Sequence, residues 1–272
     1  DQPTVVLLLA DNLGFGDLSV SNDGTRGGMR TPNIARLASE GLRFTQFRVE
    51  PGCPPSRAGL MTGQYSIRSG MSLIIVAGVA GGLQPDDVTL GTIAKSAGYN
   101  TTYMGKWHLG PMPKSQPQNQ GFDQWILGFK GTTDSVLYAE SIATFNAPEA
   151  LRKAAGGMIL EAKKPGSEAK PIRPYDRAYR RQIEGDIAAA ASSYIKEQAS
   201  NDDPFFLMWG LFGGAVALMI VFSLLFSRWE RSRAKNIEAA LTPDERLQAA
   251  YEAYEKSGYI RKMKWWHWLL FL

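Results

Sequence analysis

Cys53-Pro54-Pro55-Ser56-Arg57 contains the only cysteine of this 272-residue chain. An extended pattern over 44–50 precedes it, and a short helical pattern over 57–62 follows it. The sequence therefore predicts that Cys53 lies at a helix N-terminus, where backbone N–H groups and the helix dipole favour anions. Such a position suits a nucleophile or an anion-binding site. The alternative is a buried cysteine that packs as a small apolar side chain.

Polar side chains follow two other segments that have strand patterns. Residues 4–10 form a short apolar and β-branched run, and residues 101–105 form a second strand pattern. The polar residues that follow these segments are Asp11, Asn12, Lys106 and His108. Lys106 and His108 are separated by one residue, so both would point to one face of a strand. Because ligands bind at the carboxyl ends of strands in open α/β sheets, a site is predicted at this edge.

Further helices and strands are expected in the N-terminal part. Pro at a first helical position and Gly as a stop mark the first helix. The expected helices cover 31–41, 86–97 and 177–199, and the expected strands cover 42–49 and begin again at Phe205. Residues 145–176 are polar and contain Pro and Lys, so we expect an excursion on the surface.

Composition narrows the class of protein. Hydrophobic residues make up 44% and charged residues 21%, which is typical of a globular rather than a disordered chain. The net charge of +4 is mild, and no long basic run occurs before Arg228, so a nucleic-acid partner is not expected. A single cysteine excludes an intrachain disulfide framework.

An apolar stretch begins near Trp209. No charged residue occurs from Pro204 through Ser227, and 209–227 is long enough for one transmembrane helix. The alternative is a buried core helix. Arg228 and three further basic residues follow, which predicts a cytoplasmic C-terminus and an N-terminal part outside the cytoplasm, periplasmic or extracellular. Three regions are therefore expected: 1–208, the membrane span 209–227, and a cytoplasmic tail over 228–272.

The tail has features of a membrane-associated segment. Residues 242–245 form a capping box, so a helix is expected to follow. Basic residues at 261–264 precede the tryptophan-rich end 265–272, a pattern typical of an interfacial anchor. His267 is either a polar member of this aromatic belt or a ligand for a metal or tetrapyrrole in a partner. The lipid bilayer and an integral-membrane protein complex are the expected partners.

Three stretches together resemble the sulfatase family. Cys-x-Pro-Ser-Arg at Cys53 resembles the first family signature, and Gly98–Gly110 resembles the second. The opening, Val5 to Asp17, is also similar. The resemblance is closest to arylsulfatases and covers about 4–208. It implies an α/β fold, with the mixed sheet and flanking helices of alkaline phosphatases and sulfatases, in the N-terminal half only.

The resemblance also implies roles for individual residues. Cys53 would be oxidised to formylglycine and supply the nucleophile, and Arg57 would hold it and neutralise charge. Lys106 and His108 would contact the sulfate or the formylglycine. A sulfate ester is negatively charged, and its leaving oxygen gains charge in the transition state, so cations and an acid are needed. The family's metal-ligand pair for Ca²⁺ or Mg²⁺ corresponds to Asp11 and Asn12.

Two functional hypotheses follow. The first is a membrane-anchored, exported arylsulfatase that hydrolyses a sulfate ester. The second is a catalytically inactive, sulfatase-derived subunit that docks on a larger membrane complex. In the family, a second metal-ligand pair, a further histidine and a further lysine lie beyond the strand at Phe205, where this chain has the apolar run. A phosphatase or phosphotransferase on the related fold is a weaker alternative, because those relatives use other nucleophiles.

Overall fold

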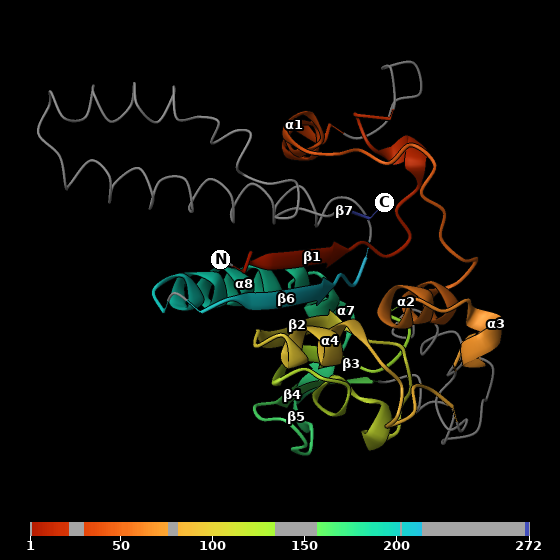
Figure 1. The fold of residues 1–272 in the computed structure, drawn as a ribbon, viewed down its shortest axis with the longest axis vertical. Coiled ribbons are helices and arrows are strands. Elements are labelled where there is room, and N and C mark those ends of the chain that lie inside the picture. Colours follow the sequence, from red (N-terminus) through yellow and green to blue (C-terminus); the bar gives the residue numbers. More distant parts are fainter. Residues whose placement is uncertain are drawn as a thin grey trace, which may run out of the picture.

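A seven-stranded mixed sheet forms the centre of the computed structural model, which describes residues 2–21, 30–75, 81–133, 157–201, 203–213 and 270–271. The strand order is β5-β4-β3-β2-β6-β1-β7 (Figure 1). The strands are β1 (Val5–Leu9), β2 (Asn100–Lys106), β3 (Gln124–Phe129), β4 (Gly157–Ala162), β5 (Lys170–Tyr175), β6 (Phe205–Gly210) and β7 (Leu270–Phe271). β3, β2, β6, β1 and β7 run parallel to one another, whereas β4 is antiparallel to both of its neighbours, β3 and β5. The predicted α/β class with a mixed sheet is confirmed.

Helices cover both faces of the sheet. They are α1 (Pro32–Glu40), α2 (Cys53–Thr62), α3 (Ser66–Ser69), α4 (Leu90–Ser96), α7 (Arg177–Arg180) and α8 (Ile183–Ala199), with short 3-10 turns at Phe15–Asp17, Pro113–Ser115 and Pro117–Asn119. Alternate residues of β6 enter two different cores. Leu207 packs with residues of α1 and α8, whereas Met208 packs with residues of α2. A strand buried on both faces is continuously apolar, which explains the sequence of β6.

The boundary predicted at Trp209 is wrong. β6 continues through Trp209 and Gly210, which pair with β1 and β2 inside the sheet. A doubly buried strand and a membrane span are both uncharged, so the sequence shows no break between them. Residues 214–227 lie outside the described part. Within the described ranges, the structure contains no helix with both the length and the apolar character needed to cross a bilayer.

The expected cytoplasmic tail also lies almost wholly outside the described residues, including His267. Leu270 and Phe271 are the exception, and they form β7 beside β1. This pairing corrects the expectation that these two residues belong to an interfacial anchor.

Two expectations about the edges of the fold are also wrong. Residues 42–49 are exposed, bend at 45–46 and do not form a strand. Residues 157–175, expected as a surface excursion, instead supply β4 and β5 at one edge of the sheet. Pro171 and Pro174 lie on β5, and proline is tolerated on an edge strand because that strand needs fewer N–H donors.

Candidate functional site

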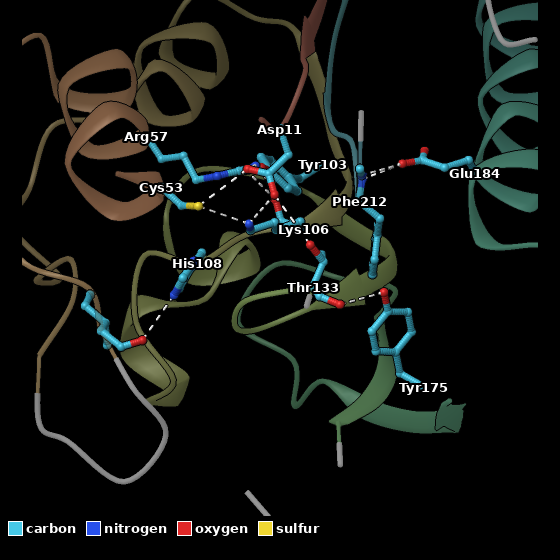
Figure 2. A network of polar contacts seen from close by, with 12 residues as sticks. Asp11, Cys53, Arg57, Tyr103, Lys106, His108, Thr133, Tyr175, Glu184 and Phe212 are labelled. Atoms are coloured by element: carbon cyan, nitrogen blue, oxygen red, sulfur yellow. Dashed lines mark hydrogen bonds and ion pairs between the residues drawn. The ribbon is translucent and has the colours of Figure 1, made fainter. Parts of the chain in front are cut away.

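All of the predicted polar residues except Asn12 meet at the carboxyl edge of the sheet (Figure 2). Asp11 lies just beyond β1, Lys106 is the last residue of β2, and Cys53 is the first residue of α2. Arg57 lies one turn further along α2. The sheet edge and the helix N-terminus, which the sequence predicts separately, therefore form one site.

A buried ion-pair cluster organises this site. Lys106 Nζ donates to Asp11 Oδ2 at 2.5 Å, and Arg57 Nη2 donates to Asp11 Oδ1 at 3.4 Å. The exposed fractions are 1% for Lys106, 2% for Arg57 and 5% for Asp11. Burial alone would raise the pKa of Asp11, but the two cations outweigh it and hold the pKa below its ordinary value. Two cations face one carboxylate, so the excess positive charge favours an incoming anion.

Cys53 lies against this cluster. Lys106 Nζ donates to Cys53 Sγ at 3.3 Å, and Cys53 Sγ donates to Asp11 Oδ1 at 3.5 Å. The cysteine is half-buried, so its sulfur is not enclosed in the apolar core. These polar contacts rule out the alternative of a cysteine that only fills apolar space.

Tyr103 and Gly210 fix the position of Arg57, and sequence reasoning missed both. Arg57 Nη1 donates to the Lys106 carbonyl at 2.8 Å and to Tyr103 Oη at 3.4 Å. Burial raises the pKa of Tyr103 to about 12, and its hydroxyl donates to the same carbonyl at 2.6 Å. A Cβ on Gly210 would lie 2.2 Å from the Lys106 carbonyl oxygen and 2.9 Å from Arg57 Nη1, so only glycine fits beside the guanidinium and the carbonyl that it binds.

His108 lies beside the cluster, but not in the predicted way. β2 ends at Lys106, and His108 has φ of 57°, so strand alternation does not set its direction. Its Nε2 is 3.1 Å from the Ile75 carbonyl oxygen, and within the described chain its buried Nδ1 has no partner. Burial, and then Lys106, lower the pKa of His108 to about 4. The imidazole is therefore neutral at neutral pH.

The described residues do not by themselves fit a Ca²⁺ or Mg²⁺ ion. Each carboxylate oxygen of Asp11 already contacts a cationic side chain. Asn12 is exposed. No group of three His, Cys, Asp or Glu residues that could hold a metal occurs in the described ranges. Hard divalent cations take six or more oxygen ligands, usually with several carboxylates, so the metal roles of Asp11 and Asn12 stay predictions.

Glu184 is a second, half-buried acidic residue near this edge, and sequence reasoning missed it. It follows the first residue of α8, and its Oε1 accepts hydrogen bonds from the backbone N–H groups of Phe212 and Gly213. Burial raises the pKa of Glu184 to about 7, Asp11 adds to this shift, and the two N–H groups oppose it. An acidic residue in a first helical turn is too common a pattern to have identified it.

Replacing Glu184 with glutamine is expected to change how stability depends on pH. A raised folded-state pKa stabilises the protein at low pH, and this contribution is lost as pH rises from about 4.5 through 7. Between these pH values, the free energy of unfolding should therefore fall less for E184Q than for the unaltered protein, and the two falls should differ by on the order of 2–3 kcal/mol. The contribution of His108 to stability changes with pH in the opposite direction, because the pKa of His108 is lowered in the folded protein. Urea titrations at pH 5, 6, 7 and 8 would measure the difference, and parallel profiles for both proteins would contradict it.

Similarity to known proteins agrees with this geometry. The sulfatase family model matches residues 3–214. N-acetylgalactosamine-6-sulfatase of Mus musculus is 39% identical over 133 residues, which are 46% of this chain and 25% of the relative. Steryl-sulfatase of Homo sapiens is 45% identical over 116 residues, which are 40% of this chain and 19% of the relative. The chain therefore spans about a fifth to a quarter of the length of these relatives.

Solved structures show the same fold. PsFucS1 sulfatase from Pseudoalteromonas sp. superposes with a TM-score of 0.70 at 25% identity, covering 83% of this chain and 49% of that one. Ps i-CgsB superposes with a TM-score of 0.64 at 22% identity, covering 86% of this chain and 56% of that one. The chain spans about half the length of each.

Proposed function

Because the chain belongs to the sulfatase family, we propose that it hydrolyses sulfate esters, with aryl sulfates as the substrate class, at Cys53 after conversion of that residue to formylglycine. The observation that carries the proposal is the contact of Cys53 Sγ with Lys106 Nζ at 3.3 Å, beside the buried Arg57. In the converted protein, an oxygen would occupy the place of this sulfur. Water would add to the formylglycine aldehyde, and a hydroxyl oxygen of the resulting hydrate would attack the sulfate sulfur while the bond between sulfur and the leaving alcohol oxygen breaks.

The chain's own residues would bind the sulfate and stabilise developing charge. Lys106 and Arg57 are held rigidly, since each contacts Asp11 and Arg57 also contacts a backbone carbonyl. Cations fixed before the reaction stabilise a transition state without a cost of reorganisation. His108 is neutral, and its buried Nδ1 can accept a hydrogen bond from a group that enters the site.

Conversion of Cys53 is the first expected result. Full-length protein, expressed in a host that converts sulfatase cysteines, should carry formylglycine in the peptide that contains Cys53. Tandem mass spectrometry would identify it, and an aldehyde-reactive probe would label the same peptide. The protein should then hydrolyse a chromogenic aryl sulfate in preference to the matching aryl phosphate. Complete conversion without sulfate hydrolysis would contradict the proposed function.

The second candidate is an inactive, sulfatase-derived subunit of a membrane complex. This candidate is favoured by the charge of the cluster. Asp11 is its one carboxylate among the described residues, and both of its oxygens pair with Lys106 or Arg57 rather than being open to a metal ion. This candidate predicts an unconverted cysteine and no turnover. Co-purification of a stoichiometric membrane partner would support it, and isolation of an active monomer would exclude it.

Membrane anchoring with the sulfatase domain outside the cytoplasm is a further part of the proposal. It rests on the uncharged run that continues beyond β6 to Ser227 and on the basic residues from Arg228. Alkaline carbonate washing of membranes should leave the protein in the pellet. Its release into the supernatant would count against a spanning segment.

A further inference from the structure

Glu184 joins α8 to the end of β6. Its Oε1 accepts from Phe212 N at 2.5 Å and from Gly213 N at 3.2 Å. β6 ends at Gly210, and Leu211 N still donates to the Leu9 carbonyl, so the next two N–H groups lie beyond the strand ladder. One carboxylate oxygen therefore holds the chain just where it leaves the sheet. A neutral residue without an acceptor would leave two N–H groups unpaired there.

A continuous series of contacts leads from this point to the ion-pair cluster, and Figure 2 shows its path. The ring of Phe212 packs on Tyr175 at 5.4 Å between centroids. The Tyr175 hydroxyl donates to the Thr133 carbonyl at 2.9 Å. The Thr133 hydroxyl donates to Asp11 Oδ2 at 3.4 Å. Asp11 Oδ2 is the oxygen that pairs with Lys106.

We propose that Glu184 is a positioning residue of the site. By fixing Phe212, it keeps Tyr175 in contact with Thr133, and Thr133 then holds Asp11 in the orientation that serves Lys106 and Arg57. Glu184 itself does not touch Cys53 in the network, so its effect passes through these intermediate residues. The expected effect on catalysis rests on the proposed function, whereas the expected effect on local order does not.

Three changes test the proposal on the full chain. Glu184→Ala removes the acceptor, Glu184→Gln keeps an acceptor oxygen of the same size, and Tyr175→Phe removes only the hydroxyl that reaches Thr133. Glu197→Ala is the matched control, because Glu197 is an exposed residue of the same helix. Hydrogen–deuterium exchange and steady-state turnover would be measured for each variant, well below its midpoint of thermal unfolding.

Exchange measures the local order directly. Glu184→Ala should speed amide exchange in 205–213 and in the segment that contains Thr133. Tyr175→Phe should do so only in the Thr133 segment. Glu184→Gln and Glu197→Ala should resemble the unaltered protein. If Glu184→Ala folds and leaves amide exchange at Thr133 unchanged, the proposal is overturned. If Glu184→Ala does not fold, Tyr175→Phe decides instead, and unchanged exchange at Thr133 in that variant overturns the proposal.

Turnover separates positioning from a merely structural role. Glu184→Ala should lower kcat roughly 10- to 100-fold with little change in KM, because a misplaced group loses transition-state contacts. Glu184→Gln should restore most of kcat. If Glu184→Ala keeps the full kcat, the proposed link to the site is wrong. If the unaltered protein shows no turnover, the proposed function fails, and the exchange results still decide the role of Glu184.

Discussion

Cys53→Ala is expected to reduce hydrolysis of a chromogenic aryl sulfate to background, a loss of roughly 10⁴-fold or more. The change removes the side-chain atom that Lys106 and Asp11 contact, and no other cysteine exists in the chain to replace it. The fold should persist, because the side chain is half-buried and lies at the first position of α2. Initial rates and the midpoint of thermal unfolding would be measured together.

Ser69→Ala is a suitable control for this experiment. Ser69 ends α3, near α2 in the chain, and among the described residues its hydroxyl bonds only locally, to the Ser66 carbonyl. This variant should keep full turnover. Substantial sulfate hydrolysis by Cys53→Ala, in protein free of contaminating sulfatase, would refute the assignment of Cys53 as nucleophile.

Asp11→Asn is expected to destabilise the protein by about 3–5 kcal/mol, because it leaves two buried cations without a countercharge. Lys106→Met should cost less, since Asp11 and Arg57 would remain as a balanced pair. The two partners of the Lys106–Asp11 pair should therefore contribute unequally to the free energy of unfolding. Both changes should also abolish turnover, since Lys106 would bind the sulfate and Asp11 orients it.

Lys95→Met provides the matched control for the buried pairs. Lys95 Nζ pairs with Asp123 at 2.5 Å, the same distance as in the Lys106–Asp11 pair. Its side chain is 43% exposed, however, so its loss should cost less than about 1 kcal/mol. Urea denaturation at pH 7 would give all three values. A loss for Asp11→Asn no larger than that for Lys95→Met would contradict the excess-charge account.

The sequence was sufficient to predict the parts of the site that local patterns encode. Apolar runs that end in polar residues placed Asp11 and Lys106 at one sheet edge, and the helix start at Cys53 is as expected. The direction of His108 was not predictable, because its left-handed backbone breaks the alternation of the strand before it. A pattern with a period of two carries no information about the residue at which the strand stops.

Contacts between distant residues were beyond sequence reasoning. Thr133 and Asp11 are 122 residues apart, and neither stands in a motif with the other. The end of β6 was missed for a different reason. A strand buried on both faces and a membrane span are both apolar and uncharged. Only the pairing of Trp209 and Gly210 with neighbouring strands distinguishes the two.

Because Gly210 lies at the end of β6, the site is sensitive to a one-residue shift in the register of that strand. Neighbouring residues of this strand face opposite cores, so deleting one residue upstream would exchange its two faces. Leu211 would then take the place of Gly210, and its side chain would fill the space that Arg57 now needs, so the guanidinium would be displaced. Substitutions in β6 that preserve size should therefore be tolerated far better than any change in its length.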